Sequence, residues 1–563
     1  MELCFFCFIK YFCTPPPPPV RMSQRKILFH DRSTDSENDS NDQNQNNVTL
    51  QRKKRKRTIC STSDSESEKI EANDSCRDIW TSKRFLPKIH KFSSKDSGIK
   101  ENISRSAKIL DYFQLFVSEE LVELIARETN EYYSQKNNNN INNSEETGLA
   151  ELYRFFAVSF LMTRNKKLSL LEYWSKDKFL RSEIFGEIMT RDRYLKLLQM
   201  LHFTHTVDPT NDRLHKIRNV IDILRTKFSQ AFQPYERLCI DESLLLYRGR
   251  LSFKQYIPSK RNRFGVKSFI LSDCQTGFVL DLLVYAGSST MVHSDNQDIG
   301  ISGAIVETLM KPYLGVGHTL YVDNWYSSPA LFNFLHNNCT NACGTVRKRR
   351  KGMPKIDERL KRGEATFRSC TNLLVTKWMD KKEVYMLSTM HTSEFGTIIK
   401  HGGTKVIRKP VCVLDYNNSM GAVDKADMVI STVNSTRKTL KWYRKFFFHL
   451  LDICVWNAYC LYKDKMKEPI SMAKFQLQLI REILGKYHQA TKRQPLTGNN
   501  HPGRLTERHF PSVYKSAGRN RSRRCVVCSA NDKRHESKYE CKDCNVGLCI
   551  DPCFKIYHCE INY

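Results

Sequence analysis

The stretch Leu238-Cys239-Ile240-Asp241-Glu242-Ser243 indicates which fold to expect for this 563-residue chain. A short apolar run that ends in a carboxylate is typical of a buried strand with a functional group at its end. The pattern recurs where His318–Val322 precedes Asp323. Val411–Leu414 is a further predicted strand, before a helix that carries Asp424. Strands that alternate with helices predict an α/β sheet domain.

Neighbouring segments fit the same sheet. Ser268–Leu271 and Val279–Tyr285 flank the turn-like sequence Asp273–Gly277, and this order predicts a hairpin. Pro329–His336 is predicted to be a helix. Between residues 344 and 409, 17 Lys or Arg stand against six Asp or Glu. We therefore expect a basic, β-rich insertion within the sheet domain.

The rest of the chain divides into segments by composition and periodicity. Apolar residues at three- and four-residue spacing indicate helices on both sides of the sheet domain, with an Asn-rich loop at 137–143. Few large apolar residues near the N-terminus predict disorder there. The predicted order is 1–105 disordered, 106–236 helical, 237–343 sheet, 344–409 insertion, 410–429 sheet, 430–487 helical, 488–524 linker and 525–559 cysteine-rich.

The chain is strongly basic. Its 90 Lys and Arg exceed its 60 Asp and Glu, giving a formal net charge of +30. An excess of this size favours an anionic polymer, because Lys and Arg are attracted to phosphates. Double-stranded DNA is therefore the expected partner, and a merely basic soluble protein is the alternative.

Three features near the N-terminus bear on location. The run Arg52–Arg57 is typical of a nuclear import signal or a phosphate-binding patch, and Ser63–Glu68 is an acidic serine cluster of the kind that kinases modify. A solvated tail is the alternative for both. The apolar first 13 residues precede five prolines, so we expect translation to start at Met22 or residues 1–21 to be an artefact. No apolar run is long enough to span a bilayer. We expect a nuclear protein.

Four carboxylates are candidates for catalysis: Asp241, Asp323, Asp424 and Asp427. The last two are three residues apart, so a helix would place them on one face. Magnesium, a hard cation, prefers such oxygen ligands. Two such ions activate an attacking oxygen and stabilise a leaving oxygen in phosphodiester chemistry. A strand-terminal aspartate is also a common helix cap, and on pattern alone that alternative stays open.

The blocks around these residues resemble those of piggyBac transposases. The first block is Ile240–Leu244, followed by Arg248-Gly249-Arg250, Gln255–Pro258 and Phe264–Lys267. Val322–Ser328 resembles the second block. Gly421-Ala422-Val423-Asp424 with Asp427 is similar to the third, although Ala422 replaces a usual glycine. Trp442 and the aromatic helix after it also fit, and the likeness runs from about residue 111 to 558.

The resemblance implies an RNase H-like catalytic domain interrupted by an insertion domain. It implies that Asp241, Asp323 and Asp424 hold two magnesium ions, or manganese in their place, with Asp427 in support. It also implies cut-and-paste transposition at terminal repeats with TTAA target sites, and that the helical segments form a dimerisation and DNA-binding domain. A domesticated, catalytically silent DNA-binding protein is the alternative, because such a copy can keep its acids.

Basic residues near the first and second blocks are predicted to hold DNA phosphates, with a generic basic surface as the alternative. These residues are Arg248, Arg250, Lys254, Lys260, Arg261, Lys267, Arg347, Lys348 and Arg349.

The C-terminus has a strong zinc signal. Of 20 cysteines, seven lie in the last 39 residues, several in pairs two residues apart, as in zinc sites of a reducing compartment. The expected ligands are Cys525, Cys528, Cys541, Cys544, Cys549, Cys553 and His558. Seven ligands exceed one tetrahedral site, so we expect two zinc ions and an eighth ligand, His535 or Cys559. Similar domains of the piggyBac family bind transposon ends, and a RING-type ubiquitin-ligase module is the alternative.

Overall fold

The structure is a computed structural model that describes residues 79–560, apart from 94, 96, 105, 137–145, 206–211, 259–262, 291, 293, 295, 401–404, 436–438, 489–504, 506–507 and 517–518. The predicted import signal, the acidic serine cluster, residues 1–21 and the Asn-rich loop lie outside these residues. So do Lys260 and Arg261, two of the predicted DNA contacts.

The core is a nine-stranded mixed sheet in the order β4-β5-β3-β7-β8-β11-β10-β9, with β6 beside β5 and with β4 formed by Gln255–Tyr256. At its centre, β3 (Arg237–Leu246) pairs in parallel with β7 (Thr319–Val322), which pairs in parallel with β8 (Asn341–Thr345). On the other side of β3, the antiparallel strands β5 (Phe264–Asp273) and β6 (Val279–Val284) form the predicted hairpin. The expectation of a sheet with strand–helix alternation is confirmed.

The basic insertion extends this sheet. Strands β9 (Ala365–Ser369), β10 (Leu374–Met379) and β11 (Glu383–Ser388) join it because β11 pairs with β8. Two further strands, β12 (Phe395–Lys400) and β13 (Lys405–Pro410), pair only with each other.

Residues 411–414, predicted to be a strand, begin a helix, α9 (Val411–Ser419). The four-residue apolar run was ambiguous by itself. Its continuation to Ser419 buries Cys412, Val413 and Ser419, a helical spacing, and β13 ends at Pro410 directly before it. Helix α10 (Ala422–Thr432) follows at once and carries Asp424 and Asp427, as predicted.

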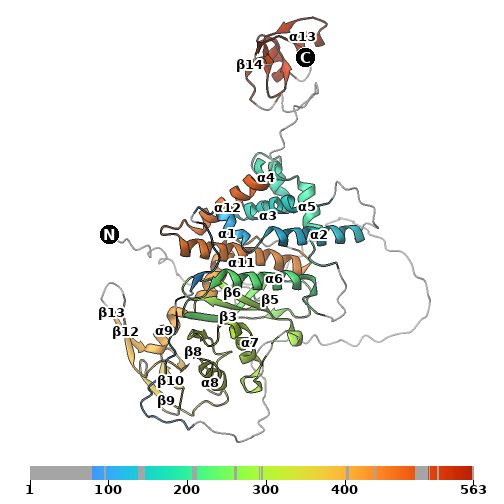
Figure 1. Ribbon diagram of the computed structural model, residues 1–563. Coiled ribbons are helices and arrows are strands. Elements are labelled where there is room, and N and C mark those ends of the chain that lie inside the picture. Colours follow the sequence, from blue (N-terminus) through green and yellow to red (C-terminus); the bar gives the residue numbers. More distant parts are fainter. Residues whose placement is uncertain are drawn as a thin grey trace, which may run out of the picture. The chain divides into compact units, whose positions relative to one another are not determined.

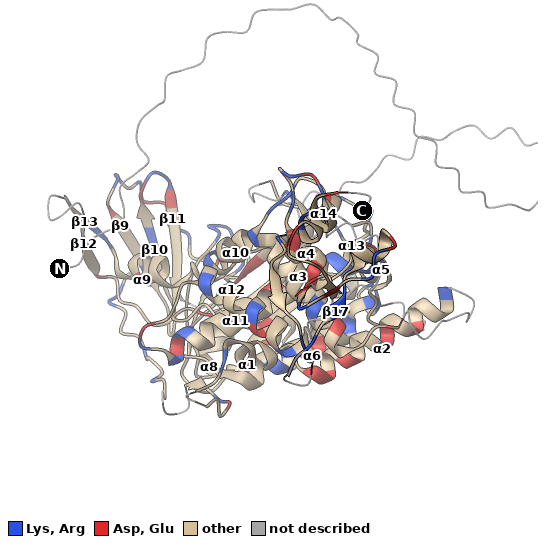
Figure 2. Cartoon of the chain, turned by 90° about the horizontal axis from the view of Figure 1, so that it is seen from above, with Lys and Arg blue, Asp and Glu red and all other residues tan. Residues whose placement is uncertain are grey.

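Helices from both ends of the chain pack together on one side of the sheet (Figure 1). In the N-terminal half, α1 (Ile109–Gln114) contacts α11 (Trp442–Lys465) and α12 (Met472–Tyr487), and α3 (Leu149–Arg164) also contacts α12. The other helices of this group are α2 (Glu119–Lys136), α4 (Glu183–Ile188), α5 (Arg191–Met200) and α6 (His215–Ala231). Figure 2 shows acidic residues gathered along α2.

Helix α11 fixes this helical group to the sheet. It is buried nearly all round, and its Trp456 indole donates to the Gly277 carbonyl in the β5–β6 turn, at 2.7 Å. The Asn457 amide closes two hydrogen bonds of 2.9 Å with the backbone of Val279. Gly277 has a φ of 80°, which favours glycine, and a β-carbon there would lie 3.0 Å from the Trp456 ring.

The described part of residues 79–104 is folded, contrary to the expectation of disorder up to residue 105. Phe85 is buried, and the backbone of Thr81 pairs with that of Ser369 at the edge of the sheet. The backbone of His90 exchanges two hydrogen bonds with the Asn341 side chain. Apolar residues scattered among the charges thus suffice to hold this segment on the sheet.

The C-terminal module has its own small core. It combines a three-stranded sheet, β14 (Pro511–Val513), β19 (Tyr539–Cys541) and β20 (Val546–Gly547), with helices α13 (Val526–Ala530) and α14 (Cys553–Cys559). Because β14 belongs to this sheet, the module begins before Cys525, within the segment expected to be a linker up to residue 524. No helix in the described part of the chain is long and apolar enough to cross a membrane.

Candidate catalytic carboxylates and metal centres

The sheet register places Asp241 beside Asp323. The parallel ladder of β3 and β7 runs to Ile240 opposite Val322, so the next residue on each chain is the aspartate. Asp241 is not at a strand end, as the sequence had suggested, because β3 continues to Leu246 against β5. Its carboxylate accepts the Glu242 backbone N–H at 2.8 Å, and that of Asp323 accepts the Trp325 N–H at 2.8 Å.

Helix α10 brings the other two carboxylates to the same face of the sheet. Ser243 follows Asp241 by two residues, so both side chains point to one face of β3. The Ser243 hydroxyl donates to Asp427 Oδ1 at 2.7 Å. Asp424 lies one turn earlier on the same side of α10 and is exposed.

Helix α9 is held on this face by Asp415, a residue that the sequence analysis did not single out. Its carboxylate accepts the Tyr321 hydroxyl at 2.5 Å, forms an ion pair with Arg237 at 3.0 Å and lies 3.1 Å from His391 Nε2. Arg237 and Tyr321 precede the two aspartates on β3 and β7 by even spacings, so all four share a face. Burial opposes ionisation of Asp415, but hydrogen bonds from His391 and Tyr321 and the charge of Arg237 lower its pKa.

We call the part of the sheet around Asp241 and Asp323 the carboxylate edge. Its negative charges repel one another when no cation is bound. Burial, and then the charge of Glu242, raise the pKa of Asp323 above its ordinary value. Burial beside the same carboxylates also raises the pKa of the enclosed Tyr326. A divalent cation would offset this accumulated negative charge, and the oxygen donors suit a hard ion such as Mg²⁺.

The predicted DNA contacts fall into different surroundings. Arg248, Arg250, Lys348 and Arg349 are exposed. Lys267 is not, because its ammonium lies 3.1 Å from Glu242 and both side chains are under 15% exposed.

Two of the remaining predicted contacts are partly engaged with the chain itself. The Lys254 ammonium donates to the Gly249 carbonyl at 3.0 Å. Arg347 Nε donates to the Asn324 side chain, immediately after Asp323, at 3.5 Å. The neighbouring Arg350 donates to the carbonyls of Asn324 and Trp325 at 2.9 and 2.7 Å. This basic turn is therefore attached to the loop that follows the second aspartate.

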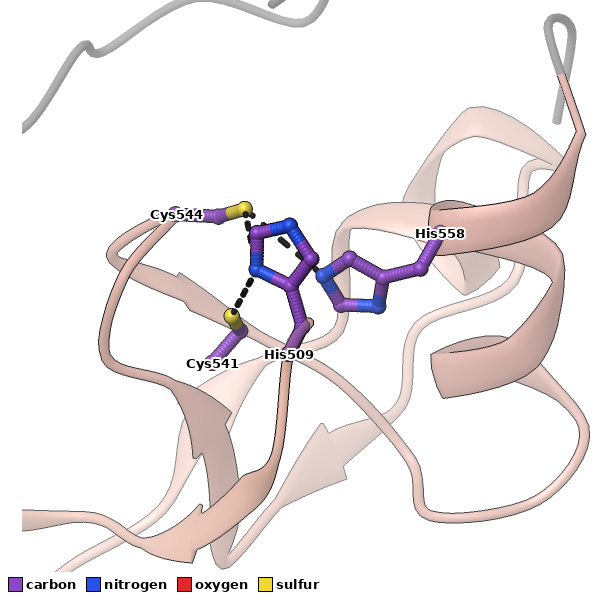
Figure 3. Close-up of side chains that lie close together, drawn as sticks. All are labelled: His509, Cys541, Cys544 and His558. Carbon is purple, nitrogen blue, oxygen red and sulfur yellow. Dashed lines mark hydrogen bonds between the residues drawn. The ribbon is translucent and has the colours of Figure 1, made fainter. Parts of the chain in front are cut away.

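All seven predicted zinc ligands fall into two groups of four, and His509 completes the second group. Cys525, Cys528, Cys549 and Cys553 form one; His509, Cys541, Cys544 and His558 form the other (Figure 3). Within each group the ligand atoms lie within 4.8 Å of one another. Among the described residues, no cluster that contains a carboxylate has its ligand atoms this close together. Two tetrads of thiolate and imidazole donors suit tetrahedral zinc.

Neither His535 nor Cys559, the expected eighth ligands, belongs to a tetrad. His535 Nδ1 lies 3.2 Å from Cys549 Sγ but outside the group of four, and Cys559 is exposed. His509 Nδ1 lies 3.4 Å from Cys541 Sγ. The sequence signal for it was weak, because a single histidine 16 residues before Cys525 has no ligand at short spacing.

Two family models match the chain. One, described as Transposase IS4, matches residues 110–459. The other, described as a DDE_Tnp_1-like zinc finger, matches residues 504–559, which favours a transposase zinc finger over a RING module. The fold and the sites therefore define a transposase of the IS4 type with a C-terminal zinc finger.

Two human relatives indicate which family of transposases the chain resembles. The human PiggyBac transposable element-derived protein 3 is 24% identical over 475 residues, covering 80% of this chain and 76% of the relative. The human PiggyBac transposable element-derived protein 2 is 22% identical over 499 residues, covering 85% of this chain and 81% of the relative.

A solved structure has the same fold. The cryo-EM structure of a piggyBac transposase synaptic complex with hairpin DNA matches with a TM-score of 0.63 and 24% identity, covering 81% of this chain and 98% of that one. The chain belongs to the piggyBac family of transposases.

Proposed function

We propose that this protein is a DNA transposase that cuts and rejoins DNA at transposon ends, with TTAA as target site. The observation that carries the proposal is the convergence of carboxylates on one sheet face. Asp241 and Asp323 follow paired residues of two parallel strands, and the Ser243–Asp427 hydrogen bond ties α10 to the same face.

In this proposal Asp241, Asp323 and Asp424 hold magnesium, which activates the attacking oxygen and stabilises the leaving oxygen when bound. Asp427 supports them by holding α10 against β3 through Ser243. Tyr321 and Arg237 hold α9 through Asp415, so the strands that carry the two sheet aspartates keep a fixed spacing.

The exposed Arg248, Arg250, Lys348 and Arg349 are proposed to contact DNA phosphates beside the carboxylates. The structural relative is described as a complex with hairpin DNA, which supports DNA as the substrate. The C-terminal module is proposed to bind two zinc ions and the transposon ends.

The test is an excision assay in cells. A donor plasmid carries the genomic DNA from both sides of the coding sequence around a reporter, and repaired junctions are sequenced. Wild type is expected to excise and restore TTAA, and Asp241→Ala to excise nothing. Asp357→Asn, an exposed aspartate in the insertion, is the matched control and should excise as wild type does. Equal excision by wild type and Asp241→Ala would refute the catalytic assignment.

A silent, domesticated DNA-binding protein is the second candidate, favoured by the description of the human relatives as transposable element-derived proteins. It predicts that wild type binds the flanking DNA but leaves it intact. The same assay, run beside a binding measurement on those DNA ends, separates the two candidates.

Two further expectations belong to this proposal. Arg52–Arg57 is proposed to direct the chain to the nucleus, so replacing these residues by alanine should leave a fluorescent fusion in the cytoplasm. The helical segments 106–236 and 430–487 are proposed to form a homodimer, and light scattering should give twice the mass of 65.9 kDa.

A further inference from the structure

The β12–β13 hairpin is the one described strand pair of the insertion that does not join the nine-stranded sheet. Its register runs from Phe395 opposite Pro410 to Lys400 opposite Lys405. A two-stranded ribbon by itself is only marginally stable in water, because one sheet face cannot bury enough apolar surface. A ribbon of this length therefore suits a surface that receives a partner.

The base of the ribbon is fixed, whereas its outer part is exposed. Both strands contact α9, and a β-carbon on Gly396 would lie 2.6 Å from the Leu414 side chain. The Lys409 ammonium lies 5.2 Å above the Trp378 ring of β10. Further out, Val406 is 63% exposed, and Thr397 and Arg408 are exposed as well.

The charge of the ribbon has one sign. The sequences of the two strands contain Lys400, Lys405, Arg408 and Lys409 and no acidic residue. Thr397 and Arg408 are register partners, and Val406 lies two residues from Arg408 on β13, so these three side chains share one face. The Arg408 guanidinium lies 5.5 Å above the Phe395 ring, which keeps it on this face. This face combines a cation, a hydroxyl and methyl groups.

We propose that the β12–β13 ribbon enters the major groove of DNA. That groove is wide enough for a two-stranded β-ribbon, whereas the minor groove is narrower. Arginine and threonine can contact base edges there, and valine can contact the thymine methyl. Six residues of strand span about 20 Å, and this length covers about six base pairs. The inference rests on the proposed function, because it presumes that DNA is the substrate.

The position of the ribbon links it to the carboxylates. Helix α9 begins at Val411, directly after β13, and Asp415 one turn later is bound to Arg237 of β3 and Tyr321 of β7. The ribbon and the strands that carry Asp241 and Asp323 therefore share a rigid connection. DNA held by the ribbon would lie at a fixed distance from the aspartates, so the ribbon would position the duplex for cleavage.

The test uses the full-length protein and a 30-base-pair duplex taken from the DNA next to the coding sequence. Dimethyl sulfate footprinting reports the major groove, because it methylates guanine N7. Wild type is expected to protect guanine N7 over about six base pairs. Val406→Glu, which adds a negative charge at an exposed position, should abolish this protection and weaken binding about tenfold. Arg408→Ala should reduce the salt slope of binding by about one.

Lys311→Ala, an exposed lysine outside both the insertion and the helical segments, is the matched control and should keep the footprint. Footprints that are identical in wild type, Val406→Glu and Arg408→Ala would overturn the ribbon proposal, including the outcome in which the ribbon binds a protein instead. Retained protection without any excision by wild type would refute the proposed transposase activity and leave the ribbon in place. Thermal unfolding of each variant checks that the fold is intact.

Discussion

The carboxylate edge and the zinc module assemble their sites in opposite ways. Asp241 and Asp427 are almost 190 positions apart and meet only through strand register and helix packing. The eight zinc ligands lie between His509 and His558, and most are paired at short spacing. The first site is therefore a product of the whole fold, whereas the second is itself a cause of folding.

The largest effect should come from zinc removal. A structural zinc contributes about 10–16 kcal/mol to the folding of a small module. A chelator is therefore expected to unfold residues 508–559 and to leave β3, β5 and β7 protected, as hydrogen exchange of the intact chain can measure. Cys553→Ser should reproduce the unfolding and Cys559→Ser should not. Likewise His509→Ala should unfold the module, whereas His535→Ala should have only a small effect on its stability. The opposite result for either pair would contradict the two tetrads.

Next in size is the loss of a sheet carboxylate. Asp323→Asn keeps the shape of the side chain but removes its charge, and should lower the excision rate by about a thousandfold or more. Circular dichroism should remain that of wild type, because the β3–β7 ladder does not depend on the charge. Unfolding of the sheet by Asp323→Asn would contradict this expectation, because the charge of the side chain would then be needed for the fold as well as for excision.

A smaller effect is expected at Asp415. Asp415→Asn removes the ion pair with Arg237, which is 48% exposed, so the cost should be about 1–2 kcal/mol, less than for a fully buried pair. The folded pKa of Asp415 is lowered, so its contribution is present above the ordinary value of about 3.9 and is lost as the pH falls through the folded value. Urea unfolding at pH 7 and pH 3 measures this. The difference in stability between the two proteins should be largest at pH 7 and should be smaller at pH 3.

The smallest effect is expected at Ser243. Ser243→Ala removes one hydrogen bond to Asp427 and should cost about 1 kcal/mol of stability. Because α10 would be held less firmly against β3, excision should fall a few fold. Ser252→Ala, at an exposed position after β3, is the control. A drop as large as that of Asp323→Asn would mean that the hydroxyl acts in the chemistry itself.

The sequence predicted local features well and tertiary ones poorly. The β5–β6 hairpin, the strand before Asp323 and seven zinc ligands each depend on residues close in the chain. Asp241 and Asp323 were candidates by pattern, but only their family blocks made them a pair, because register is set by the complete sheet. Asp415 gave no signal, since its partners Arg237 and Tyr321 lie on other strands.

The errors have the same origin. His509 was overlooked because its fellow ligand Cys541 is 32 residues away. Lys267 lies on β5 opposite Leu244 of β3, a register that brings its side chain to the face of Glu242 and that the sequence could not reveal; its contact with DNA stays a prediction. The helix at Val411–Ser419 was taken for a strand because four apolar residues do not fix a period.

The raised pKa of Asp323 has a consequence for the history of such a gene. Burial and Glu242 disfavour the ionised carboxylate, so at neutral pH this residue destabilises the folded chain when no cation is bound. A change to asparagine would relieve that burden while the sheet, the ribbon and the zinc module stay intact. An inactivating change of Asp323 to asparagine is therefore expected to meet little resistance from the stability of the folded chain.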